Sequence, residues 1–306
     1  MSLLTIFSTI IIPIVVLAAI GFVLDRAFQL DIQTLTRVGF YVFTPAIAFS
    51  TITGSELTSA EMLTIASFAV AHMVAMALLA VGLFSFKPFN DQRLVLGFGA
   101  VFFNAGNYGF PLMLLAFGEW AVGVIAIVLV VQIIFLYTVG LFLLIRAEMG
   151  VRGALDRLLR MPVLYAVLLA FVVRAFDLEL IPQIAIPLER LSEAFIAMAL
   201  ITLGAQLSRS ELAGEAASVS ALVLVRLVAS PLIAAALVVL LPISPEMAPV
   251  LVLGAGLPVA VNVFIMAREF DRRPEFASQI VFWTTVLSAA TIPLLLALVR
   301  LFPWAG

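Results

Sequence analysis

The chain has 306 residues, of which 64% are hydrophobic and only 11% charged, and its mean hydropathy is +1.25. Soluble domains are roughly half apolar and a quarter charged, so this composition excludes a water-soluble globular protein. The net charge of −2 gives no support for a nucleic-acid partner, and the absence of cysteine excludes disulfides, thiol nucleophiles and thiolate metal sites.

Ten apolar segments follow one another along the chain. Each is long enough to cross a hydrocarbon core of about 30 Å, which takes about 20 helical residues. The first lacks a basic leading stretch and a small-residue cleavage site, so we interpret it as a span and not as a signal peptide. The sequence predicts an all-α integral membrane protein with transmembrane helices at 3–24, 33–53, 61–85, 94–118, 120–145, 158–176, 187–207, 216–241, 247–268 and 276–302.

The third segment contains His72, the only histidine of the chain. A histidine can titrate near neutral pH and relay protons. The alternative is a single polar side chain that hydrogen-bonds a neighbouring helix. The sequence leaves both interpretations open.

The fourth segment is interrupted at its centre by the residues FNAGNYGFP (103–111). Two asparagines, two glycines and a proline weaken or break a helix at such a place. In a bilayer, an interrupted helix is tolerated only where it is buried in protein or lines a polar cavity. The ninth segment carries a counterpart, GAGLP (254–258), followed by Asn262.

Corresponding interruptions in two halves of a chain are typical of a transporter's substrate site. The alternative is that the glycines permit close helix packing while the asparagines hydrogen-bond between helices. Because both segments are interrupted, we favour the substrate site.

A polar link at 146–160 divides the chain into two halves, 1–150 and 151–306, with five apolar segments each. A shift of 155 residues aligns the halves and pairs Asn107 with Asn262. Since five is an odd number, the second half must be inverted in the membrane. The sequence therefore predicts a 5 + 5 inverted repeat, an architecture of secondary transporters that bind substrate near the midplane.

Two charged residues lie inside later spans. Glu193, in the first turns of the seventh segment, is either a coupling-proton site or an interfacial side chain. Arg226, near the centre of the eighth, should face protein or a cavity because a charge at that depth costs about 2.5–3.5 kcal/mol. It pairs with a substrate carboxylate, acts as a fixed cation that neutralises helix C-terminal dipoles, or bonds backbone carbonyls in a structural role.

Other intramembrane hydroxyls and amides either line the transport cavity or serve helix packing. The residues concerned are Gln132, Thr202, Gln206, Thr284 and Thr285.

The arginines and lysine are distributed unevenly between the two faces. Loops after the odd-numbered segments carry 12 of them, and the opposite face carries 3. Short cytoplasmic loops are rich in positive charge. Both termini are therefore expected outside and the middle link in the cytoplasm.

Four stretches resemble the auxin efflux carrier family, and the resemblance covers the whole chain. They are VFTPAIAF (42–49), NAGNYGFPL (104–112), TLGAQL (202–207) and LPVAVN (257–262). The resemblance implies a fold like that of bile-acid/sodium symporters, in which the fourth and ninth helices unwind and cross. It implies a scaffold of the first, second, sixth and seventh helices and a moving transport domain of the other six.

The resemblance also carries expectations for the site and the partners. It places the crossover prolines at Pro111 and Pro258, and the polar crossover positions at Asn104, Asn107 and Asn262, with Tyr108 in the same motif. Plant members carry auxin and have a long hydrophilic middle loop, which this chain lacks. It is similar to short bacterial members associated with malate or malonate, and a homodimer through the second and seventh helices is expected.

These observations predict a carrier of a small organic anion in the inner membrane, working by alternating access of the elevator type. No cofactor or metal is expected beyond a coupling Na⁺ or H⁺. A channel or a non-transporting receptor on the same fold is the alternative. An intramembrane enzyme is disfavoured, because one histidine excludes the HExxH motif and the aspartates fall at helix ends or in loops.

Overall fold

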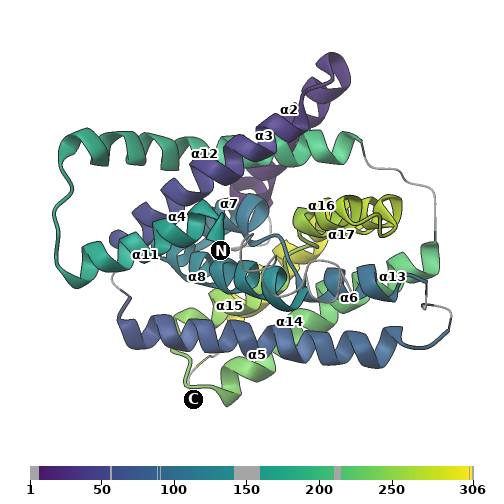
Figure 1. The fold of residues 1–306 in the computed structure, drawn as a ribbon. Coiled ribbons are helices and arrows are strands. Elements are labelled where there is room, and N and C mark those ends of the chain that lie inside the picture. The colour runs from purple at the N-terminus through teal and green to yellow at the C-terminus, as the bar shows by residue number, and fades with distance from the viewer. Residues whose placement is uncertain are drawn as a thin grey trace.

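The computed structural model describes residues 7–55, 57–87, 89, 91–140, 159–209, 215–302 and 304. Within these ranges every named element is a helix, and the only β-type pairing is one isolated bridge between Phe103 and Val259. Figure 1 shows that α5 and α12 lie at opposite edges in this view, with α7, α8 and α15 between them.

The described helices of the first half follow the expected order, with π-helical turns labelled η. They are η1 Phe7–Ile11, α2 Ile12–Phe28, α3 Ile32–Val38, η2 Gly39–Phe43, α4 Thr44–Thr53, α5 Ser59–Phe84, α6 Arg93–Val101, η3 Ala105–Gly109, α7 Phe110–Phe117, α8 Glu119–Phe135 and η4 Leu136–Gly140. The expected end of the fifth helix, at 145, lies outside the described residues.

The second half begins in the described part with α11. Its elements are α11 Pro162–Ala175, α12 Pro182–Ser208, α13 Ala216–Leu224, η5 Val225–Ala229, α14 Ser230–Leu240, α15 Met247–Ala255, α16 Val261–Glu269 and α17 Pro274–Leu301. The seventh helix was expected to begin at Pro187, but α12 begins at Pro182 and contains Pro187 in its interior. Both prolines suit a first helical turn, so the sequence alone did not separate them.

In the part of the chain that the structure describes, six helical segments are long and apolar enough to cross a membrane. They are Ser8–Phe28, Ile32–Thr53, Ser59–Phe84, Glu119–Gly140, Ala216–Leu240 and Pro274–Leu301. The all-helical class is confirmed, and several spans make this a multi-pass membrane protein. The ten-span inverted repeat stays a prediction.

Four of the π-helical turns directly precede a proline in the next α-helix, at Pro13, Pro45, Pro111 and Pro231. A proline ring clashes with the carbonyl group four residues earlier. In each case that carbonyl lies within the π-helical turn, whose wider winding makes room for the ring. The chain therefore accommodates these prolines without ending the helix.

The helix α2 packs along α12 at two glycines. A methyl group on Gly21 would collide with the backbone of Ile201, and one on Gly204 would collide with the backbone of Ala18. Small residues let membrane helices approach this closely. The ends of the same two helices are joined by an ion pair of 2.6 Å between Arg209 and Asp25.

The centre of the molecule is formed by α6, α7, α8 and α15, whose side chains are mostly buried. Apolar side chains of α2, α5 and α11 are exposed, among them Val23, Leu78 and Leu168. A large exposed apolar surface is expected where helices face lipid. The interrupted helices therefore lie inside a shell of helices whose outer faces suit a bilayer.

Candidate functional site

The two interrupted helices meet at their breaks. After α6 ends, Phe102 is extended and leads into Phe103 and Asn104. After α15 ends, Gly256 forms a turn, and Leu257–Ala260 continue outside helical structure to an extended Ala260. The two stretches pair antiparallel, with the Asn104 N–H donating to the Pro258 carbonyl at 2.9 Å and the Ala260 N–H donating to the Phe102 carbonyl at 3.0 Å. The two breaks thus satisfy some of each other's backbone hydrogen-bonding groups.

Side chains from α8 and α17 take up the remaining N–H groups of the bridged pair. The Phe103 N–H donates to Gln132 Oε1 at 3.1 Å, and the Val259 N–H donates to Thr284 Oγ1 at 3.1 Å. For Gln132 and Thr284 the sequence left open whether they line the transport cavity or serve helix packing. Both are buried and hold the backbone of the crossing. Thr285 is also buried, and its hydroxyl donates within its own helix, to the Val281 carbonyl at 2.7 Å.

The C-terminal ends of α6 and α15 converge on Arg226, which is completely buried in η5. Its guanidinium donates to the Ala100 carbonyl at 2.6 Å and to the Ala255 carbonyl. Helix C-termini carry a partial negative charge of about one half each. Of the three interpretations of Arg226, this geometry fits two, the fixed cation at helix C-termini and the structural role of bonding backbone carbonyls. Arg226 does not line the cavity described below, so the geometry gives no support to pairing with substrate.

Ser230 belongs to the same hydrogen-bond network as Arg226. It accepts a hydrogen bond from the guanidinium and donates to the Ala255 carbonyl at 2.7 Å. His72 Nε2 lies 3.1 Å from Ser230 Oγ, so the histidine contacts the neighbouring helix, as in the structural alternative. Sequence reasoning missed Ser230, although its place one turn after Arg226 in an apolar helix was an available signal.

The N-terminal ends of the other two half-helices are left without backbone partners. At the start of η3 and α7, which together form one helix, the N–H groups of Gly106 and Asn107 make no hydrogen bond to the described chain. The same holds for Val261 and Asn262 at the start of α16. Helix N-termini with free N–H groups carry a partial positive charge and bind anions.

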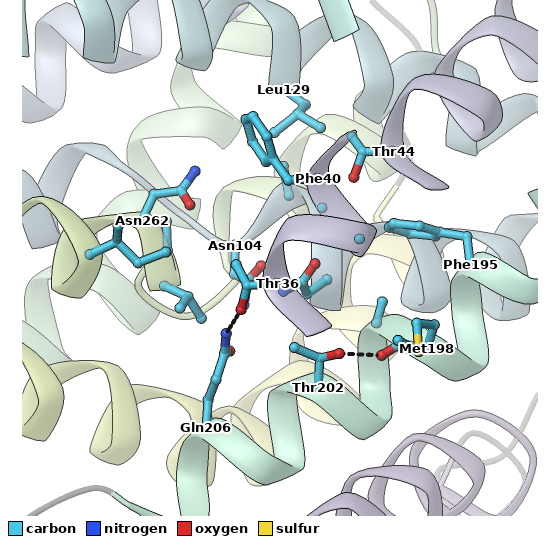
Figure 2. A pocket seen from close by; sticks show the side chains of 18 of the residues that line it. Thr36, Phe40, Thr44, Asn104, Leu129, Phe195, Met198, Thr202, Gln206 and Asn262 are labelled. Atoms are coloured by element: carbon cyan, nitrogen blue, oxygen red, sulfur yellow. Dashed lines mark hydrogen bonds between the residues drawn. The ribbon is translucent and has the colours of Figure 1, made fainter. Parts of the chain in front are cut away.

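A cavity of about 70 Å³ lies at these N-termini. It lies between the crossing and α8 on one side and α3, η2, α4 and α12 on the other, and Figure 2 shows side chains from both sides pointing into it. Its described lining is Leu35, Thr36, Gly39, Phe40, Thr44, Phe103, Asn104, Ala105, Gly106, Asn107, Leu129, Ile133, Phe195, Met198, Ala199, Thr202, Gln206, Ala260, Val261, Asn262 and Ile265. The polar lining therefore consists of amides, hydroxyls and backbone groups, without any charged side chain among the described residues.

Asn104 and two residues of α12 are among the polar residues that line the cavity. Asn104 is 5% exposed, and its Nδ2 has no hydrogen-bond partner within the described chain. On the opposite wall, Gln206 donates to Thr36 at 3.3 Å and the Thr202 hydroxyl donates to the Met198 carbonyl at 2.7 Å (Figure 2). A buried amide N–H without an acceptor is costly, which suits a site that awaits an acceptor from a ligand.

The structure thus brings five of the expected site residues together in one cavity and leaves others outside. The five are Asn104, Asn107, Thr202, Gln206 and Asn262.

The other crossover residues have supporting positions. Tyr108 is buried with its hydroxyl 3.2 Å from Ser288 of α17, and Pro111 is buried in the first turn of α7. Pro258 contributes its carbonyl to the crossing. None of the three is among the lining residues.

The structure places Glu193 away from the cavity. Its side chain is 57% exposed and forms an ion pair of 2.7 Å with Arg190, one turn earlier on α12. This is the geometry of the interfacial alternative, and nothing in it supports a coupling-proton site.

Comparison with known proteins gives one family and one curated relative. The family described as "Membrane transport protein" matches residues 6–154 and 149–296. A protein of Rhizobium meliloti (strain 1021) named "Putative malonate transporter" is 29% identical over 275 residues, covering 85% of this chain and 84% of the relative. The chain is thus similar to transporters along both of its halves.

Proposed function

This chain belongs to the membrane transport protein family, that of the auxin efflux carriers, and from this membership we propose that it carries a small organic anion across the inner membrane. Membership makes it a transporter and not an enzyme. The substrate class that we propose is a mono- or dicarboxylate, such as malonate, malate or an auxin-like acid. Its relative's name and the chemistry of the cavity support this class.

The single observation that carries the proposal is the pair of helix N-termini at the cavity. Gly106, Asn107, Val261 and Asn262 all line it, and their four N–H groups have no acceptor in the described chain. Asn104 adds a fifth unpartnered donor. Donors that converge without acceptors suit a carboxylate, whose two oxygens accept several hydrogen bonds.

The position of the cavity supports alternating access. One wall comes from α3, η2, α4 and α12, which belong to the expected scaffold, and the other comes from η3, α8 and α16, which belong to the expected transport domain. We propose that the transport domain slides against the scaffold in an elevator movement and carries the site with it. The close packing of α2 on α12 supports a scaffold that stays rigid during this movement.

Three further features complete the proposal. The protein would form a homodimer through the second and seventh helices. Both of its termini would lie outside, as the distribution of positive charge predicts. Transport would be coupled to Na⁺ or H⁺ or would run as uniport, and the experiment below distinguishes these.

Counterflow in proteoliposomes tests the proposed function. The purified protein would be reconstituted in vesicles loaded with unlabelled malonate, malate, succinate, indole acetate or a neutral amino acid. Uptake of the labelled compound would be measured with and without sodium and a pH gradient. We expect saturable accumulation of labelled carboxylate against its gradient, which a channel cannot produce. Rapid flux without counterflow would identify a channel, and binding without flux would identify a receptor.

A further inference from the structure

The charges around the crossing suggest how much charge the substrate brings, an inference that rests on the proposed function. Four helix ends meet there, two C-termini and two N-termini, each with about half an elementary charge. The C-terminal pair amounts to about one negative charge, and Arg226 lies against both of its carbonyls as one built-in positive charge. The N-terminal pair amounts to about one positive charge and faces the cavity.

Among the described residues, the lining of the cavity includes no ionisable side chain that could compensate further charge. The elements around the cavity carry several charged or titratable side chains in the described chain, and none of them lines the cavity. These side chains are Arg37, Tyr41, Tyr108, Glu119, Glu189, Arg190, Glu193 and Arg268. His72 and Arg226 lie at the C-terminal ends of the half-helices and do not line it either. Asn104 contributes a neutral N–H donor, which can bind a carboxylate but cannot balance a second charge.

We propose that the site binds one negative charge per substrate molecule, so that monocarboxylates are carried as anions and dicarboxylates in their half-protonated form. A second carboxylate bound in this cavity would lose hydration without gaining a counter-charge, which is unfavourable. A carboxylic acid group is accepted more easily. The Thr202 hydroxyl donates its own hydrogen to the Met198 carbonyl, so its oxygen remains able to accept a hydrogen bond from the O–H of a carboxylic acid group.

This mode of binding moves one proton with each dicarboxylate. Hydrogen malonate enters the site with one ionised and one protonated carboxyl group. After release on the other side it ionises again, giving the malonate dianion and one free proton. Apparent proton coupling would thus arise from the substrate, without a titrating side chain in the cavity.

The test compares malonate with monomethyl malonate, which has the same single ionised carboxylate but cannot ionise twice. Both would be measured in proteoliposomes with wild-type protein, at a potential clamped with potassium and valinomycin, over a pH range that spans the second ionisation of malonate. Above that ionisation we expect the apparent KM of malonate to rise about tenfold per pH unit, since only the half-protonated fraction binds. The KM of the ester should stay constant, and only malonate uptake should acidify the vesicle interior.

A KM for malonate that is independent of pH, or that falls as the dianion accumulates, would overturn the inference and leave the carrier intact. A parallel rise of both KM values would do the same, because it would assign the pH dependence to the protein. If neither compound is transported and the wider carboxylate panel is silent as well, the proposed function itself fails.

Discussion

At the scale of single residues, Arg226 has the most demanding position in the chain. It is fully buried and its guanidinium reaches the carbonyl ends of two half-helices from different halves of the sequence. The ring of Phe103, a lining residue of the cavity, lies 5.1 Å from the guanidinium carbon. We infer from these contacts that Arg226 positions the crossing, although it is not among the residues that line the cavity.

Replacing Arg226 tests this positioning role. Hydrogen bonds to charged groups are worth about 1.5–3 kcal/mol each, so we expect Arg226→Gln to lower uptake by about tenfold or more and to lower the melting temperature in detergent. Arg226→Lys should retain part of both, because it keeps the charge but not the planar fork of donors. Arg272→Gln, an exposed arginine, is the control. Wild-type uptake by Arg226→Gln would contradict the role.

Adjacent threonines on α17 provide a matched pair for the backbone of the crossing. Thr284 accepts the Val259 N–H, whereas Thr285 bonds only within its helix. Thr284→Val leaves a buried N–H unsatisfied and should destabilise the protein by about 1–3 kcal/mol. Thr285→Val should cost clearly less. Thermal or denaturant unfolding in detergent measures the difference, and equal losses would refute the assignment.

At the scale of elements, the sequence predicted which helices are interrupted but not how the breaks are satisfied. The glycines, asparagines and prolines of 103–111 and 254–258 indicated both breaks from local chain chemistry. The pairing of Phe103 with Val259 joins positions more than 150 residues apart, and no local pattern contains that contact. For the same reason the sequence left open whether Gln132 and Thr284 line the cavity or serve packing, and only their hydrogen bonds show that they support the crossing.

The close packing of α2 on α12 also could not be predicted from the sequence. Gly21 and Gly204 lie in ordinary apolar runs, and only their mutual approach shows that no side chain fits there. Asp25 lies near the end of α2, as expected for the aspartates, and the sequence did not show that it is 4% exposed and ion-paired with Arg209. Such pairings depend on which helix ends become neighbours.

Glycine substitutions test that packing. In Gly21→Ala or Gly204→Ala the new methyl group meets backbone atoms of the partner helix, which cannot rotate away. Overpacking of this kind costs about 1–3 kcal/mol or more. Gly82→Ala on α5, where the space around the glycine is open, should be neutral or slightly stabilising. The melting temperatures of the three variants measure this loss of stability. An unchanged melting temperature for Gly21→Ala and Gly204→Ala would contradict the close contact.

At the scale of the whole molecule, composition alone was enough to predict a multi-pass helical membrane protein. The orientation rests on the distribution of 12 against 3 positive residues, which is a property of loops and not of any contact. The absence of cysteine makes the chain a ready background for single-cysteine labelling. Orientation can therefore be tested without removing any native residue that reacts with maleimide.

Two exposed loop positions test the orientation. Glu179 lies between α11 and α12, on the face expected outside, and Asp271 lies between α16 and α17, on the face expected in the cytoplasm. In intact cells a membrane-impermeant maleimide should label Glu179→Cys, and it should label Asp271→Cys only after permeabilisation. The reverse pattern would invert the proposed topology.

The central claim is that the transported anion binds in the cavity at the crossing, against the N-terminal residues Asn107 and Asn262 and their side-chain amides, and one comparison of variants tests it most directly. Counterflow of labelled malonate would be measured for the wild type, for the double variant Asn107→Ala/Asn262→Ala and for Gln33→Ala, in which an exposed amide outside the cavity is removed. At equal expression and melting temperature, we predict that the double variant loses most of its uptake while Gln33→Ala keeps it. Wild-type uptake by the double variant would show that the anion binds elsewhere.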